Sequence, residues 1–75
     1  MKEYALRCCD LILLARQDVT GWRWVVDGPG AKNAASATDE NAAKKACISV
    51  AKARFRRRGM PIPTDLIQPQ WSSGS

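Results

Sequence analysis

Apolar and polar residues alternate over a long segment near the start of the chain. Between Tyr4 and Arg16 one face holds Cys9, Leu11, Leu13 and Ala15, and the other holds Asp10, Ile12, Leu14 and Arg16. A period of two residues predicts a β-strand. Because Ile12 and Leu14 interrupt the polar face, we expect the C-terminal segment or a second copy to cover that face, unless the segment is partly helical.

The segment from Trp22 to Asp27 is the clearest second strand. Aromatic and β-branched residues dominate it, and its side chains alternate between two faces. Gly28, Pro29 and Gly30 then predict a tight turn. The short Ala-rich segment 32–37 returns from this turn. We therefore expect a three-stranded antiparallel meander.

A single long helix is predicted over residues 39–57. Thr38 is the expected N-cap, and Gly59 is the expected C-cap glycine. Asp39 and Glu40 lie in the first turn, where the helix dipole stabilises negative charge. One apolar stripe is formed by Ala43, Ala46, Cys47, Val50 and Ala51. A stripe at this spacing predicts a helix that packs closely on the sheet.

The chain changes character after Gly59, because prolines interrupt regular structure there. The apolar residues of this region are Met60, Ile62, Leu66, Ile67 and Trp71. They lie either on the domain itself or on a partner. The predicted fold class is therefore α+β, a small three-stranded antiparallel sheet packed on one C-terminal helix and followed by a proline-containing irregular arm. We divide the chain into a sheet-plus-helix domain, residues 1–59, and an arm, residues 60–75.

Composition narrows the possible classes of function. Hydrophobic residues make up 45 % of the 75 residues, as in folded domains. No apolar run approaches the roughly 18–20 residues that span a bilayer, and the N-terminus does not resemble a signal peptide. Three cysteines without histidine predict buried thiols in a reducing compartment, with no metal and no cofactor. We therefore expect a cytoplasmic, non-catalytic protein that has no membrane partner.

Positive charge is concentrated in one segment of the predicted helix. Residues 44–58 hold seven cations and no acid: Lys44, Lys45, Lys52, Arg54, Arg56, Arg57 and Arg58. A solvated helix face usually mixes both signs of charge. A run of one sign is typical of a surface that binds phosphates. The segment Trp22-Arg23-Trp24 adds a second feature, because it can present Arg23 to a base edge while the two indoles pack in the core.

The start of the predicted helix carries a resemblance to two DNA-binding domains. Residues 37–46 read Ala-Thr-Asp-Glu-Asn-Ala-Ala-Lys-Lys-Ala and follow a Trp-containing strand. This order resembles the plant ethylene-response-factor DNA-binding domain and the arm-binding domain of phage tyrosine recombinases, over about residues 20–58. The resemblance implies a three-stranded sheet against one helix, with the outer sheet face in the DNA major groove.

These observations together predict a small nucleic-acid-binding protein, a regulator or a mobile-element accessory factor, which prefers DNA to RNA. The predicted phosphate ligands are Lys45, Lys52, Arg54, Arg56, Arg57 and Arg58, and Arg23 is the predicted base contact. A homodimer is also compatible with so short a chain. The alternative is a protein–protein adaptor or inhibitor that binds an acidic protein, or that docks through Met60, Ile62, Leu66, Ile67 and Trp71 or through a sheet edge.

Overall fold

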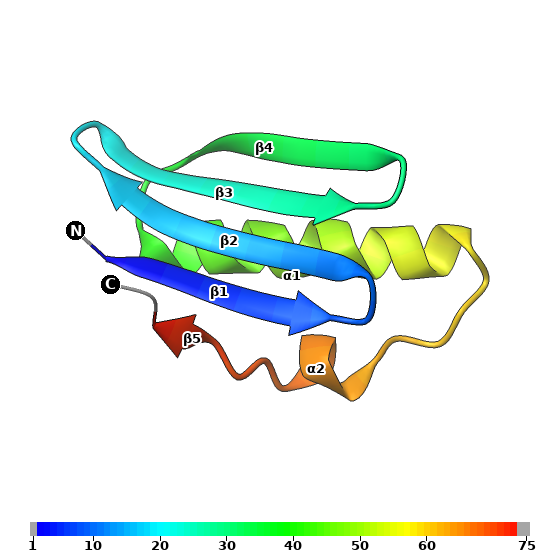
Figure 1. Ribbon diagram of the computed structural model, residues 1–75. Coiled ribbons are helices and arrows are strands. Elements are labelled where there is room, and N and C mark those ends of the chain that lie inside the picture. The colour runs from blue at the N-terminus through cyan, green and yellow to red at the C-terminus, as the bar shows by residue number, and fades with distance from the viewer. Residues whose placement is uncertain (1, 74–75) are drawn as a thin grey trace.

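A computed structural model describes residues 2–73 and shows a small α+β fold (Figure 1). Its elements are β1 (Glu3–Cys8), β2 (Leu11–Asp18), β3 (Gly21–Gly28), β4 (Ala31–Ala37), α1 (Glu40–Arg57), α2 (Thr64–Ile67) and β5 (Ser72–Ser73). They form one antiparallel sheet of five strands in the order β4-β3-β2-β1-β5. The predicted fold class, a three-stranded sheet on a C-terminal helix, is therefore wrong in its strand number and in the position of the helix.

The single strand predicted from Tyr4 to Arg16 is a hairpin of two strands. Cys9 and Asp10 form the connection, and Cys8 lies opposite Leu11 across it. Cys9 adopts a φ of 56°, in the left-handed region that lets the chain reverse within two residues. The reversal keeps Cys8 and Leu11 on the same face of the sheet, and both are buried.

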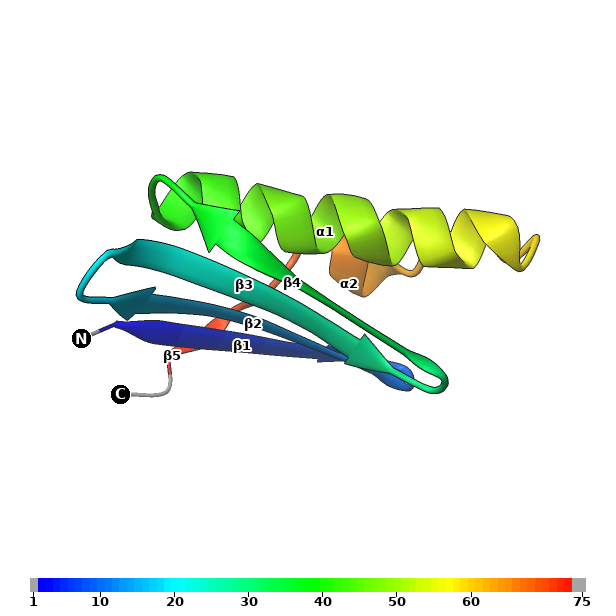
Figure 2. The ribbon, with the colours of Figure 1, turned by 90° about the horizontal axis from the view of Figure 1, so that it is seen from above.

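The long helix α1 packs on one face of the sheet and builds the core there (Figure 2). Its buried residues are Ala43, Cys47, Ala51 and Phe55. The side chain of Asp39 accepts a hydrogen bond from the backbone N–H of Ala42 at 2.8 Å, so Asp39 and not the predicted Thr38 is the N-cap. Small residues on the buried stripe let the helix approach the backbone of the sheet. The Cys47 thiol, for example, donates to the carbonyl oxygen of Leu14 at 3.3 Å.

The segment after Gly59, which we call the arm (residues 60–73), packs back along the β1 edge of the sheet (Figure 1). The short helix α2 places Leu66 in the core, where only 1 % of its surface is exposed. Beyond it, Ser72 and Ser73 pair with Ala5 and Tyr4 of β1. The expected irregular arm therefore contains a helix and a strand. The last two residues of the predicted arm, 74–75, lie outside the described part.

Candidate functional site

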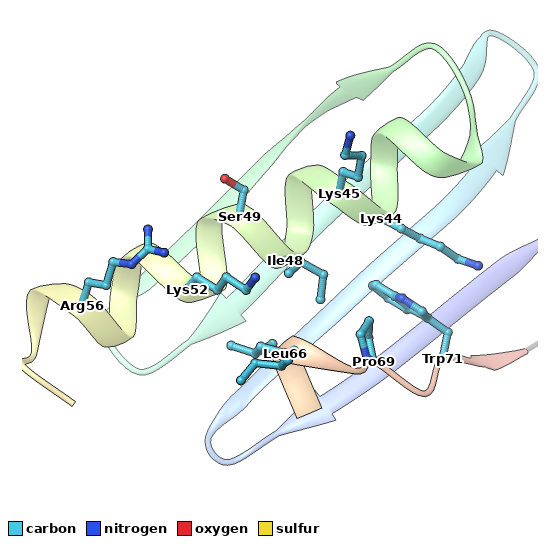
Figure 3. A pocket seen from close by; sticks show the side chains of 10 residues that line it. Lys44, Lys45, Ile48, Ser49, Lys52, Arg56, Leu66, Pro69 and Trp71 are labelled. Atoms are coloured by element: carbon cyan, nitrogen blue, oxygen red, sulfur yellow. The ribbon is translucent and has the colours of Figure 1, made fainter. Parts of the chain in front are cut away.

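A basic groove runs between α1 and the arm, with a volume of about 490 Å³ (Figure 3). Its lining residues come from these two elements alone: Lys44, Lys45, Ile48, Ser49, Lys52, Arg56, Leu66, Ile67, Pro69 and Trp71. Four of them are cations and none is an acid. The groove therefore attracts anions along the whole length of its helical wall.

Helix periodicity brings the cations of this wall together. Lys45, Ser49, Lys52 and Arg56 follow one another at spacings of four, three and four residues, which place them on one face of an α-helix. From Lys45 to Arg56 the rise along the helix axis is about 16 Å. For Lys45, Lys52 and Arg56 the described residues provide neither an ion pair nor a side-chain hydrogen bond. These three side chains are therefore available to a ligand.

The arm supplies the apolar wall of the groove. Leu66 is held in the core, whereas Ile67 remains 61 % exposed beside it. Pro69 and Trp71 continue this wall toward β5, and Ile48 of α1 contributes from the helical side (Figure 3). The groove thus combines a cationic side with an apolar side that carries one indole ring. This arrangement suits a ligand that has both anionic groups and flat apolar surfaces.

Lys44 lies at the end of the groove nearest β5 and is held by groups of the protein. Its ammonium group donates to a Glu40 carboxylate oxygen at 2.9 Å and lies 3.8 Å from the centre of the Tyr4 ring. The Trp71 ring centre is 5.7 Å away. The hydrogen bond from Lys44 holds the pKa of Glu40 below its usual value. Lys44 therefore joins helix, sheet and arm through cation–π contacts and an ion pair.

Two of the predicted phosphate ligands are engaged by other groups of the protein, Arg54 by the sheet and Arg58 by a surface ion pair. The Arg54 guanidinium donates to the carbonyl oxygen of Val26 at 3.2 Å and to the Asn33 side-chain oxygen at 2.6 Å. Arg58 forms an ion pair with Asp10 in the β1–β2 connection at 3.5 Å. Together with Arg57 these arginines line a second cavity of about 440 Å³ on the flank of α1 beside β4. The basic segment is therefore divided between two flanks of the helix.

Arg23, the predicted base contact, lies on the other side of the molecule. It follows the buried Trp22 on β3, so its side chain points to the sheet face opposite α1. Its nearest acid is Asp18, at 3.9 Å. The structure consequently brings Lys45, Lys52 and Arg56 together but separates Arg23 from them. The predicted adaptor residues are also divided, because Leu66 is buried while Met60 and Ile67 are exposed.

The sequence indicated Leu66, Ile67 and Trp71 as residues that pack on the domain or on a partner, but it did not place them beside the basic face of the helix. Ile48, Leu66, Pro69 and Trp71 become one wall only when the arm returns to the sheet, and no local pattern encodes that return. One signal for the role of Lys44 was present, since Glu40 and Lys44 are spaced i, i+4 on the helix.

The cysteine thiols are the remaining candidates for covalent or metal chemistry. Burial raises the pKa of the Cys8 and Cys47 thiols to about 11. Cys9 is exposed in the hairpin connection, and all three cysteines are unpaired. No cluster of three or more metal-ligating side chains occurs within residues 2–73. In the same range, no helix is long and apolar enough to cross a membrane.

Comparisons with protein-family models, with curated proteins and with solved structures found no match to this chain.

Proposed function

We propose that this protein is a non-catalytic nucleic-acid-binding protein whose basic groove holds a phosphate backbone. The observation that carries the proposal is the line formed by Lys45, Lys52 and Arg56, with no acid among the residues that line the groove. Each phosphate contact releases a condensed counterion, so such a line gains affinity at low salt without reading sequence. The proposed place of action is the cytoplasm, where unpaired cysteines persist.

The apolar wall supports the same ligand class. Nucleic acids present sugars and base faces beside their phosphates, and an indole ring is a stacking surface for bases. Trp71 and Pro69 lie on the arm side of the groove, toward which Lys44 and Lys52 point, whereas Lys45 and Arg56 point away from the arm (Figure 3). A backbone on the helical side would therefore direct sugars or unpaired bases toward the arm. We propose DNA before RNA and a sequence-tolerant mode of binding, as expected of a regulator or an accessory factor of a mobile element.

An acidic protein is the alternative occupant of the groove. A carboxylate-rich surface would be attracted by the same cations. Docking through the arm is less well supported, because Leu66 is already buried in the chain's own core. Within residues 2–73, β4 is an edge strand of the sheet, and strand addition there is the other form of this alternative.

Titration of a fluorescent 20-nucleotide single strand and of its duplex, at about 50 mM salt, tests the proposal by fluorescence anisotropy. The double variant Lys52→Ala, Arg56→Ala should weaken binding to either probe by about tenfold, equivalent to ~0.7 kcal/mol per lost contact. The matched control is Arg16→Ala, Lys32→Ala, which removes the same charge from the opposite face and should change affinity less than threefold. Equal weakening by both pairs, or capture of poly-glutamate but of neither probe, would exclude a phosphate-binding groove.

A further inference from the structure

The sheet has a second face, which carries a regular pattern of charge. Within residues 2–73 no helix covers this face, because α1 and the arm's short helix α2 both lie on the other side (Figure 2). We call it the outer face and describe it by the rows of residues that lie side by side across β1 to β4. The middle row is Ala5, Leu14, Val25 and Ala34. The centre of the outer face is therefore wholly apolar.

The row on the side of the chain's N-terminus carries mostly positive charge. Its members are Glu3, Arg16, Arg23 and Ser36. Arg16 and Arg23 lie directly opposite each other on neighbouring strands, an arrangement that destabilises a sheet unless a counter-charge is present. The described part offers Arg23 only Asp18, at 3.9 Å, and gives Arg16 no ion pair. Arg16 also lies opposite Glu3 on β1, so Arg23 is the arginine of this row that an acid approaching from above the face would pair with.

The row on the other side of the apolar centre provides such an acid. Its members are Arg7, Ile12, Asp27 and Lys32. Asp27 lies on β3, as Arg23 does, and Arg7 lies on β1, as Glu3 does. On these two strands, opposite charges are thus placed at equal distances on either side of the middle row. Ile12, on β2, is 38 % exposed on the same row.

We propose that the outer face binds a second copy of this chain, across a two-fold axis that runs along the middle row, perpendicular to the strands. Rotation about this axis leaves each strand over its own copy and exchanges the two charged rows. Arg23 then faces the partner's Asp27, and Glu3 faces the partner's Arg7. Leu14 and Val25 each meet their own copies at the centre. This is an isologous contact in which one surface complements itself.

Two stacked sheets can also be related by a two-fold axis that runs parallel to the strands, and the charges on the outer face disfavour that arrangement. An axis parallel to the strands would keep each row over itself. Arg16 would then lie over the partner's Arg23, and Arg7 over the partner's Lys32. Such like-charge contacts disfavour that arrangement. In the proposed arrangement the aliphatic stem of Arg16 covers the partner's Ile12, so this apolar side chain leaves water.

The size of the face determines how strong the association is. Four strands about 4.8 Å apart, each contributing five residues at about 3.4 Å, give a projected area of roughly 320 Å² per copy. This is well below the roughly 800 Å² per partner of a standard stable interface. From an interface of this size we expect a weak, reversible dimer that forms only at high protein concentration. The groove-bearing helix of each copy would face outward, on opposite sides of the dimer.

Sedimentation equilibrium at about 50 mM salt, from ~5 to ~500 μM protein, tests this inference. The wild type should show a monomer–dimer equilibrium. Arg23→Asp alone, or Asp27→Arg alone, turns two attractive contacts into repulsive ones and should weaken dimerisation by about tenfold or more. The double swap Arg23→Asp, Asp27→Arg re-forms both pairs with reversed sign and should recover dimerisation to within about threefold of the wild type.

Both swap positions are exposed, so far-UV circular dichroism should show that the variants fold. The pair Glu3→Arg, Arg7→Glu provides an independent second swap. A wild type that stays monomeric over the whole range overturns the proposal, as does a double swap as weak as its single parents. Loss of nucleic-acid binding in Arg23→Asp with an unchanged oligomeric state also overturns it and assigns the face to nucleic acid. The groove variant Lys52→Ala, Arg56→Ala should still dimerise, which separates this inference from the proposed function.

Discussion

Removal of the Leu66 side chain should show that the arm is part of the folding unit. Leu66 is 1 % exposed and packs with the core of sheet and helix, although it lies nine residues beyond Arg57, where α1 ends. Buried Leu→Ala changes cost about 2.7–5.0 kcal/mol, because they remove apolar contacts and leave a cavity. A chain of this length has a total stability of roughly 4–11 kcal/mol. Leu66→Ala should therefore remove a large part of the free energy of unfolding.

The neighbouring residue provides a matched control. Ile67 is also aliphatic and lies on the same short helix, but 61 % of it is exposed. Ile67→Ala should change stability by no more than about 0.5 kcal/mol. Thermal unfolding followed by circular dichroism should place Leu66→Ala at least about 10 °C below the wild type, given ~4–8 °C per kcal/mol for a domain of this size. Equal melting temperatures for the two variants would show that the arm does not pack as described.

Three further predictions concern the helix and the thiols. Arg54→Met should lower stability by about 1–2 kcal/mol in urea unfolding, because it removes the hydrogen bonds to Asn33 and to the sheet backbone, and it should leave nucleic-acid affinity unchanged. Mass spectrometry after brief alkylation at pH 8 should show one adduct, on Cys9, because Cys8 and Cys47 are buried thiols with pKa values of about 11. The folded state keeps the thiols of Cys8 and Cys47 protonated at pH values where the thiols of the unfolded chain have already lost their protons. The free energy of unfolding should therefore fall between about pH 9 and 11. A free energy of unfolding that stays constant over this range would contradict the burial of the two thiols.

The elements with strong local signals could be predicted from the sequence. The helix begins at an acidic first turn and ends before Gly59, and the turn at Gly28–Gly30 follows the expected strand. Local chemistry specifies these features, so no distant contact was needed to find them. The N-cap is Asp39 where Thr38 was expected, a shift of one residue between two good capping side chains.

The β1–β2 hairpin was missed because its connection lacks glycine, proline and asparagine. A signal was nevertheless present in the parity of the apolar residues. Leu6 and Cys8 occupy even positions, whereas Leu11 and Leu13 occupy odd ones. A two-residue connection produces such a change, because the residues that flank it share a face. A continuous strand would have kept one parity throughout.

The composition of the candidate site depended on long-range contacts. Seven cations in one segment predicted a broad phosphate-binding surface. In the fold, Arg54 donates a hydrogen bond to Asn33 of β4, and Arg58 forms an ion pair with Asp10 in the β1–β2 hairpin. Lys44 contacts Glu40 and the Tyr4 ring. None of the sheet contacts can be read from helix periodicity, because they depend on where β1 and β4 lie. The proposed site is therefore smaller than the charge pattern alone suggested.

The salt dependence of nucleic-acid binding tests the central claim most directly. Three groove cations, Lys45, Lys52 and Arg56, should give a slope of log K against log[salt] of about −2.7 on duplex DNA, at ~0.9 per phosphate contact. Lys52→Ala, Arg56→Ala should flatten this slope by about 1.8, because two contacts are lost, and the control Arg16→Ala, Lys32→Ala should leave it unchanged. An absence of binding at about 50 mM salt, or a slope that the groove variant does not alter, would contradict the account.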